Sequence, residues 1–174
     1  MERLTELALT ARDGNRLALE RFTRETLPDV QSLCWHLGDP DNVEDLVQET
    51  YARMMRSLPN FRGDGPARSW LLRIARNTCA DATRRRRRSR TRRAFEELPD
   101  VADAPPSGWS EVSSVVAGLD SDRRQAFVLT QILGLPYQEA ADVLGVPIGT
   151  VRSRVARARN DLLQLEVEPV EIHQ

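Results

Sequence analysis

Lysine is absent from this chain of 174 residues, and cysteines and aromatic residues are few. Every one of the 25 basic residues is therefore an arginine, a bias as typical of a GC-rich genome as of a requirement for guanidinium groups. The two cysteines, Cys34 and Cys79, form no CxxC or HxxxC spacing, so we expect neither a disulfide framework nor a metal site. Aromatic residues make up 5% of the chain and β-branched runs are scarce, which favours helices over sheets.

Long hydrophobic runs are also missing. No apolar stretch approaches the ~20 residues that span a bilayer, and the N-terminus, MERLTELALT, has no signal-peptide core. We therefore expect a cytoplasmic protein without membrane insertion. No motif indicates a cofactor or a small-molecule substrate, and we expect neither.

Charge is strongly segregated along the chain, although the net charge is only -1. Residues 61–93 hold 12 arginines against 2 acids, whereas residues 94–120 hold 6 acids and no arginine. A second basic stretch, residues 121–161, has 6 arginines against 4 acids. Two basic segments separated by an acidic one are typical of a protein that contacts a polyanion twice.

The acidic segment EELPDVADAPPSG contains three prolines and a glycine, so it favours neither a long helix nor a packed core. We interpret residues 94–107 as a flexible acidic linker between two small helical domains, 1–93 and 108–174. The fold class is therefore predicted to be all-α. Hydrophobic periodicity predicts helices at 2–12, 15–37 with a break near Pro28, 41–57, 67–90, 121–133, 137–144 and 148–164.

The helix at 41–57 is amphipathic, with Leu46 and Val47 on its apolar side and Asp45, Gln48 and Glu49 on a polar, partly acidic side. From the residues alone, a solvated face is the simplest interpretation. A catalytic carboxylate pair is disfavoured because no histidine or further acid is placed to complete it.

The helix at 67–90 is predicted to turn a second polar face outward. Ser69, Arg73, Arg76, Asn77 and Arg84 share this face, and their donors suit phosphates and bases. The preceding loop, FRGDGPARSW, combines glycines with two aromatic residues and could admit an unstacked base, although a plain interhelical loop has the same composition. The run RRRRR at 84–88 covers every face of a helix, which suits attraction to phosphates independent of sequence.

The last two predicted helices form a helix-turn-helix, in which the second helix enters a major groove. Arg152 and Arg157 point outward on that helix, where each can pair with guanine, and the small Ser153 and Ala156 leave room for base edges. Arg154 and Arg159 lie on its flanks. For these two we expect a phosphate contact or an ion pair, with Glu139 as a candidate partner of Arg154.

Two blocks, DLVQETYARMMRSLPNFRGDGPARSWLLRIARNTCADATRRRRR and LPYQEAADVLGVPIGTVRSRVARARNDL, together resemble the extracytoplasmic-function sigma factors of bacterial RNA polymerase. The actinobacterial members are the most similar. The resemblance implies a non-catalytic initiation subunit that binds core RNA polymerase, recognises two elements of promoter DNA and assists DNA opening. It also allows an anti-sigma factor as a further partner.

The resemblance implies roles for three groups of residues. Those that match the polymerase-binding motif are Asp45, Val47, Gln48 and Glu49. Those that match the segment reading the minus-10 element and capturing a flipped base are Phe61, Arg62, Asp64, Ser69, Trp70, Arg73, Arg76, Asn77, Asp81 and Arg84. Those that match the reader of the minus-35 element are Thr150, Arg152, Ser153, Ala156, Arg157 and Arg159.

The sequence departs from the family pattern at two places. Asp81 stands where relatives often carry an amide or a basic residue, and an acid near DNA is unfavourable unless it accepts from a base amine such as cytosine N4. The loop RGDGPARS lacks the aromatic residue that some relatives place just before the serine or threonine. The competing interpretations are a free-standing dimeric DNA-binding regulator and a metal-dependent nuclease using Asp41, Glu44, Asp45 and Glu49.

Overall fold

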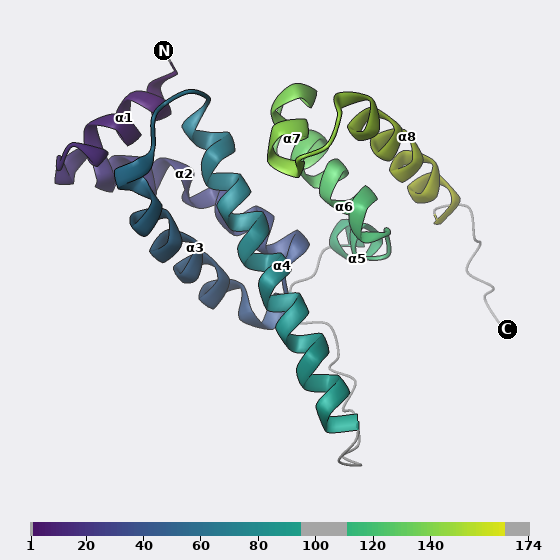
Figure 1. Ribbon diagram of the computed structural model, residues 1–174. Helices are drawn as coiled ribbons and strands as arrows, with labels where there is room; N and C mark the ends of the chain where they lie inside the picture. The colour runs from purple at the N-terminus through teal and green to yellow at the C-terminus, as the bar shows by residue number, and fades with distance from the viewer. Residues whose placement is uncertain (1, 95–110, 166–174) are drawn as a thin grey trace, which may run out of the picture. The chain divides into compact units, whose positions relative to one another are not determined.

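The structure is a computed structural model that describes residues 2–94 and 111–165 (Figure 1). The chain divides into two compact units, Met1–Pro106 and Ser107–Gln174. The described residues form helices and no strand, so the all-α prediction is confirmed. The predicted linker at 94–107 lies outside the described residues except for Ala94, the last residue of its helix.

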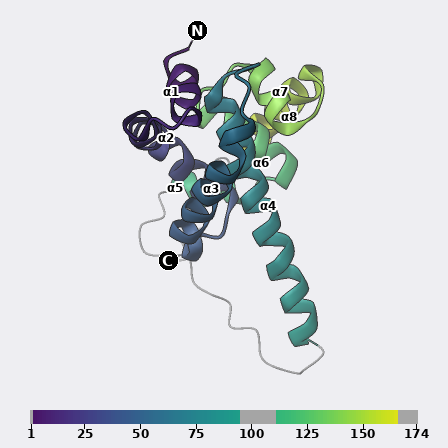
Figure 2. The same ribbon diagram turned by 60° about the vertical axis from the view of Figure 1, so that its left-hand side comes forward.

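Residues 2–94, the described part of the first unit, form a bundle of four helices in which α2 packs against the other three. Its helices are α1 (Arg3–Arg12), α2 (Arg16–Leu37), α3 (Val43–Ser57) and α4 (Ala67–Ala94), with short 3-10 turns η1 (Pro40–Asn42) and η2 (Leu58–Asn60). The core is built from fully buried side chains such as Phe22 and Leu33 of α2, Met54 of α3 and Leu71 of α4. The C-terminal part of α4 projects beyond the bundle (Figures 1 and 2).

Helix α2 runs without interruption through Pro28, so the predicted break at this position is wrong. Proline removes one amide hydrogen and leaves the carbonyl of Arg24, four residues earlier, without its helical donor. Both Pro28 and Arg24 are exposed, so water can satisfy that carbonyl. Val30 and Leu33 pack in the core beyond the proline, and this burial holds the helix together.

The described residues of the second unit, 111–165, form four helices and one π-helical turn. They are α5 (Glu111–Ala117), α6 (Ser121–Phe127), the π turn η3 (Val128–Ile132), α7 (Tyr137–Leu144) and α8 (Ile148–Leu165). Helix α8 packs against α6 and α7 around a core that includes Leu129, Val143, Val151 and Val155. Helix α5 was not predicted, and the predicted helix at 121–133 ends in the π turn.

The turn between α7 and α8 is that of a helix-turn-helix, as predicted. Gly145 ends α7 with φ 68°, in the left-handed region, and its amide donates to the carbonyl of Ala141 at 2.8 Å. Glycine adopts this conformation without the steric cost that a Cβ imposes. Pro147 then accepts from the amide of Thr150 at 2.9 Å, in the first turn of α8.

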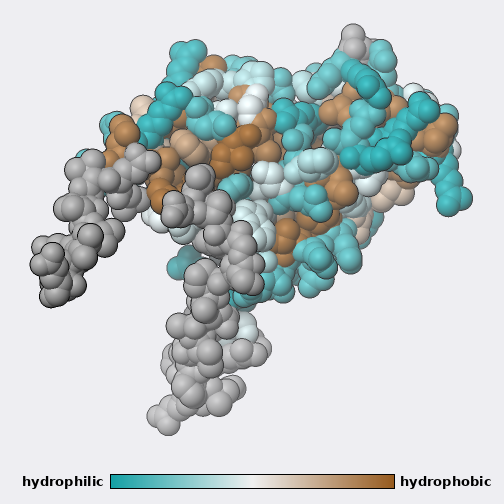
Figure 3. Space-filling model, turned by 180° about the vertical axis from the view of Figure 1, so that it is seen from behind, coloured by the Kyte–Doolittle hydropathy of each residue, from teal (hydrophilic) through white to brown (hydrophobic). Residues whose placement is uncertain are grey.

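Hydrophilic side chains dominate the face seen in Figure 3, with smaller apolar areas between them. Among the residues that the structure describes, the exposed large apolar side chains are Leu17, Met55 and Leu163. They stand on three different helices, α2, α3 and α8. Scattered apolar side chains of this kind are normal on a protein surface.

Candidate nucleic-acid and polymerase interfaces

Helix α3 exposes part of the motif expected to bind polymerase. Asp45 and Gln48 are exposed, and Glu49 is half-buried. Val47 is only 9% exposed and packs in the core, so its side chain holds the helix in place and offers little surface to a partner. Asp45 lies in the first turn of α3, where the helix dipole favours negative charge.

Arg53 of α3 bonds one acid on its own helix and one acid on α4. Its Nε donates to Glu49 Oε1 at 2.7 Å, and its Nη1 donates to Asp81 Oδ2 at 2.6 Å. Arg84, one turn further along α4, also pairs with Asp81. The hydrogen bonds from Arg53 are the main reason why the pKa values of both acids lie below their ordinary range. Asp81 is thus a counter-ion between two arginines of its own unit.

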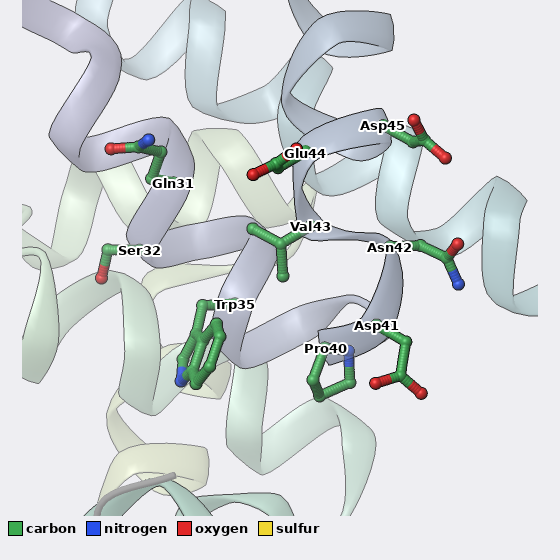
Figure 4. Close-up of a pocket in the computed structure, with 9 residues that line it drawn as sticks. All are labelled: Gln31, Ser32, Trp35, Pro40, Asp41, Asn42, Val43, Glu44 and Asp45. Atoms are coloured by element: carbon green, nitrogen blue, oxygen red, sulfur yellow. The ribbon is translucent and has the colours of Figure 1, made fainter. Parts of the chain in front are cut away.

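A groove of about 760 Å³ lies where the end of α2, η1 and the start of α3 meet (Figure 4). Trp35, Pro40 and Val43 supply apolar lining, and acidic residues including Glu44 and Asp45 stand beside them. This groove was not predicted, because its apolar residues come from two helices and the turn between them. It adjoins the exposed face of α3 through Asp45.

The two aromatic residues around the loop at 61–66 pack on each other. The ring centroids of Phe61 and Trp70 are 4.6 Å apart at an interplanar angle of 37°. Phe61 is only 6% exposed, whereas Trp70 is half-buried. Phe61 is therefore part of the core, and Trp70 is the more exposed of the two aromatic side chains. In the loop itself Arg62 and Asp64 are exposed.

Helix α4 turns most of its predicted polar face to solvent. Arg73, Asn77 and Arg84 are exposed, and Arg76 is half-buried and donates to Asn77 Oδ1 at 3.2 Å. Ser69 is only 7% exposed, so its predicted place on this face is wrong. It lies in the first turn, where α4 enters the bundle and most of its circumference is covered.

Some of the arginines at 84–88 form ion pairs within the first unit. All five side chains are exposed, but Arg84 pairs with Asp81, and Arg86 pairs with Asp39 at the end of α2. These ion pairs tie the first part of the run back to the bundle. The attraction of this run to phosphates stays a prediction.

Helix α8 divides its residues as the periodicity predicted. Val151, Val155 and Ala158 are buried, whereas Arg152 and Arg157 are exposed. The other members of the predicted reading face, Ser153 and Ala156, are exposed as well, and Thr150 is half-buried. The exposed face of α8 thus combines two guanidinium groups with small side chains, an arrangement suited to close approach to base edges.

The flanking arginines of α8 are held by other helices. Arg154 pairs with Asp122 at the start of α6, so the expected ion pair is confirmed, with Asp122 as a partner where Glu139 was the suggested candidate. Arg159 Nη2 donates to Gln131 Oε1 at 2.6 Å. The sequence correctly predicted the start of α6, where Asp122 lies. The pairing of Asp122 with Arg154 was not predicted, because it depends on how α6 and α8 pack against each other.

Two negative findings apply to the parts of the chain at 2–94 and 111–165. No helix there is both long enough and apolar enough to cross a membrane. No three side chains of histidine, cysteine, aspartate or glutamate gather there in a way that could hold a metal ion.

Each of the two units matches one family of transcription factor domains. The sigma-70 region 2 family matches residues 22–89, and the sigma-70 region 4 family matches residues 110–162. Two helical units with these matches, the second carrying a helix-turn-helix, define a sigma factor, the class of protein that directs RNA polymerase to promoters.

The similar proteins narrow the class to one branch. The ECF RNA polymerase sigma factor SigC of Mycobacterium tuberculosis is 45% identical over 174 residues, covering 97% of this chain and 93% of that protein. The chain belongs to the extracytoplasmic-function sigma factors, among their actinobacterial members. The resemblance seen in the sequence is thereby confirmed.

Solved structures agree in fold over nearly the whole chain. CnrH, determined in complex with the cytosolic domain of CnrY, has a TM-score of 0.75 at 30% identity and covers 97% of this chain and 100% of that one. The sigma factor RpoE of Bartonella quintana, determined with the anti-sigma factor NepR, has a TM-score of 0.73 at 27% identity and covers 87% of this chain and 98% of that one.

Proposed function

We propose that the two units divide promoter recognition between them. Residues 1–93 act as the domain that binds core RNA polymerase and the minus-10 element, and residues 108–174 act as the domain that reads the minus-35 element, with 94–107 as the connector. The observation that carries the proposal is that each unit exposes arginines on the helix expected to meet DNA. These are Arg73 and Arg84 on α4 and Arg152 and Arg157 on α8.

Polymerase docks on the exposed face of α3. Asp45 and Gln48 are available for direct contact, and the groove beside Asp45 offers apolar surface from Trp35 and Val43. Glu49 is held by Arg53, so it presents an oriented carboxylate. Val47 contributes by holding α3 against the core.

The minus-10 element is read by the loop at 61–66 and by α4. Arg62 and Asp64 are exposed on the loop, and Trp70 offers a partly exposed ring on which an unstacked base can stack. Arg73, Arg76 and Asn77 supply donors on the outer face of α4. Phe61 and Ser69 support this surface from beneath, since both are buried.

The minus-35 element is read by the outer face of α8. Arg152 and Arg157 each have the fork of donors that pairs with the O6 and N7 atoms of guanine. Ser153 and Ala156 allow the helix to approach the base edges, and Thr150 lies where the N-terminal turn of α8 would meet phosphates. Arg159 is engaged with Gln131, so it contributes to the flank of this surface.

The chain acts as a subunit without chemistry of its own, in the cytoplasm, where core polymerase carries out the phosphodiester reaction. An anti-sigma factor is part of the proposal, because the similar sigma factor RpoE was determined in complex with the anti-sigma factor NepR. Its partners are thus core RNA polymerase, promoter DNA and an inhibitory protein.

The proposal is tested by transcription in vitro on fragmented genomic DNA, with core polymerase in the presence and absence of the chain. New start sites that share two spaced upstream elements are expected. Two single variants, one of them with a matched control, then separate the polymerase-binding surface from the DNA-reading surface. Gln48→Ala weakens binding to core, whereas Glu20→Gln, on an exposed part of α2, leaves it unchanged. Arg157→Ala reduces discrimination at the upstream element by about 1 to 3 kcal/mol, the contribution of one bidentate contact to a guanine, while core binding persists.

Two results would contradict the proposal. Tight, specific binding to duplex DNA by the chain without polymerase would favour a free-standing regulator. Equal loss of affinity for all DNA sequences in Arg157→Ala would remove the base-reading role from α8.

A further inference from the structure

One face of helix α1 holds both ends of the loop at 61–66. Thr5 Oγ1 accepts a hydrogen bond from the backbone amide of Ala67, the first residue of α4, at 3.0 Å. Two turns further along α1, Arg12 Nη1 donates to the backbone carbonyl of Phe61 at 3.0 Å. The loop thus begins and ends at backbone groups that are bonded to α1.

The bond from Ala67 to Thr5 replaces a helix cap. The first amides of a helix have no partner within the helix, and the preceding residue, Pro66, has no side chain that can accept a hydrogen bond. Thr5 is 3% exposed and Ala67 is fully buried, so water cannot take the place of the hydroxyl. Loss of this hydroxyl would leave a buried amide without an acceptor.

The guanidinium of Arg12 is itself oriented. Its Nε donates to Asp13 Oδ1 at 2.8 Å while its Nη1 reaches Phe61, so the two edges of the group are engaged with different partners. The hydrogen bond to Asp13 raises the pKa of Arg12. The arginine therefore stays charged and keeps one direction toward the loop.

Between these two bonds the loop lies against a third residue of α1. Gly63 adopts φ 75°, and a Cβ placed on it would be 3.2 Å from Leu9 Cδ1. Thr5, Leu9 and Arg12 follow one another at spacings of four and three residues, which places them on the same side of the helix. One stripe of α1 therefore contacts the start, the middle and the end of the loop.

We propose that α1 is the scaffold of the loop at 61–66, and that Thr5 and Arg12 are positioning residues for recognition of the minus-10 element. The inference rests on the proposed function for the role of the loop, but the scaffold itself can be tested without polymerase. Helix α1 lies outside residues 22–89, the part that matches sigma-70 region 2. A binding site for an unstacked base has to be held in place before the base arrives, because ordering a loop on binding lowers affinity.

The first measurement is amide hydrogen exchange of Phe61 and Ala67, the hydrogen-bonded amides at the two ends of the loop, in the full chain. Arg12→Gln and Thr5→Val are compared with Arg3→Gln, a variant of the same helix that removes only the exposed ion pair with Glu25. We expect exchange about tenfold faster at the loop ends of both scaffold variants, because each variant loses a hydrogen bond that holds the loop. Exchange in α3 is unchanged in all three, and Thr5→Ser, which keeps the hydroxyl, retains the slow exchange of the Ala67 amide.

The second measurement is the rate of open-complex formation with core polymerase on a promoter identified by transcription. Arg12→Gln and Thr5→Val lower this rate about tenfold and relax the base preference in the minus-10 element, since the loop is no longer held before binding. Affinity for core polymerase stays within about twofold of the parent chain, which separates positioning from a general loss of folding.

The outcomes distinguish the two levels of the inference. If the parent chain produces no promoter-specific starts, the proposed function fails whatever the exchange rates are. If the parent chain directs initiation, and both scaffold variants form open complexes at the parent rate and with the parent base preference, the role of α1 in recognition is overturned. This holds even if amide exchange at the loop is faster in the variants. Unchanged exchange in both variants overturns the scaffold directly.

Discussion

Arg53 brings together charged side chains from the two helices that are proposed to meet polymerase and DNA. It bonds Glu49 on its own helix and Asp81 on α4, and Asp81 also pairs with Arg84. With a side chain only 26% exposed, Arg53 is the least exposed member of the group. The arrangement keeps an acid on the outer side of α4 without presenting an uncompensated negative charge to DNA.

This cluster predicts a specific loss of stability in acid. The pKa of Asp81 is lower in the folded chain than in the unfolded chain, mainly because of the hydrogen bond from Arg53. The pair with Arg53 therefore contributes stability at pH values above the unfolded pKa of Asp81. This contribution is lost as the pH falls through the folded pKa of Asp81. Arg53→Gln should therefore be destabilising at neutral pH, and the difference should shrink below about pH 4. Because Asp81 is partly exposed, the effect at neutral pH is at most about 1 kcal/mol.

Urea unfolding followed by helical circular dichroism at a series of pH values measures this difference. Arg24→Gln is the matched control, since Arg24 faces Glu20 at 4.0 Å with both side chains 67% exposed. Its effect should be close to zero throughout. A constant difference between the parent chain and Arg53→Gln across the whole pH range would show that the electrostatic explanation is wrong.

At the level of elements, the turn that orients α8 depends on a single left-handed residue. Gly145→Ala places a side chain at φ 68°, and nothing lies within 4 Å of the new Cβ, so the cost comes from the backbone alone. We expect a loss of about 1 kcal/mol in the free energy of unfolding. Gly149→Ala, in the first turn of α8, also meets open space but has no positive φ, and it should be neutral or stabilising by up to about 1 kcal/mol.

Thermal unfolding of the two glycine variants measures these opposite effects. Both substitutions add one methyl group within the same helix-turn-helix, so a difference in sign isolates the backbone conformation. Equal destabilisation by both variants would contradict the role assigned to Gly145.

The sequence predicted those elements whose signals are local. Helices α3, α7 and α8 were located within a few residues, because each has a repeating apolar stripe in the sequence itself, and α7 also has Gly145 at its end. Two local signals misled. Pro28 indicated a break in α2, but the helix continues because the carbonyl that loses its donor belongs to the exposed Arg24. Helix α5 was missed because its seven residues are too few to show a hydrophobic period beside a segment rich in acid and proline.

The candidate site was predictable as a set of faces but not as a set of contacts. The outward direction of Arg152 and Arg157 follows from the period of α8. The partners of Arg53, Arg154 and Thr5 lie 28, 32 and 62 residues away in the chain, and such pairs form only when separate helices pack. Burial of Ser69 has the same origin, since it depends on which neighbours surround the first turn of α4.

At the scale of the whole molecule, the arginines fall into groups with different partners. Arg123 and Arg124 are engaged inside the second unit, the first with Asp161 at 2.6 Å and the second with the carbonyl of Leu119 at 2.9 Å. Arg157 is exposed on the reading face of α8, and Arg88 is exposed on the projecting part of α4. Net charge alone therefore does not describe how the chain acts on DNA.

These groups predict three different responses to salt when the holoenzyme binds promoter DNA. A side chain that neutralises a phosphate releases counterions, so removing it lowers the slope of log affinity against log salt by about 1. Arg88→Gln should do this and weaken binding equally on promoter and unrelated DNA. Arg157→Ala should instead reduce the preference for promoter over unrelated DNA. Arg123→Gln should change neither the salt slope nor the preference for promoter DNA. It should only lower the stability of the second unit, because the guanidinium of Arg123 already has Asp161 as counter-ion.

Binding of the three variants to promoter and random duplexes over a range of salt concentrations measures the slope and the preference. A reduced slope in Arg123→Gln would mean that an internal ion pair opens to bind DNA.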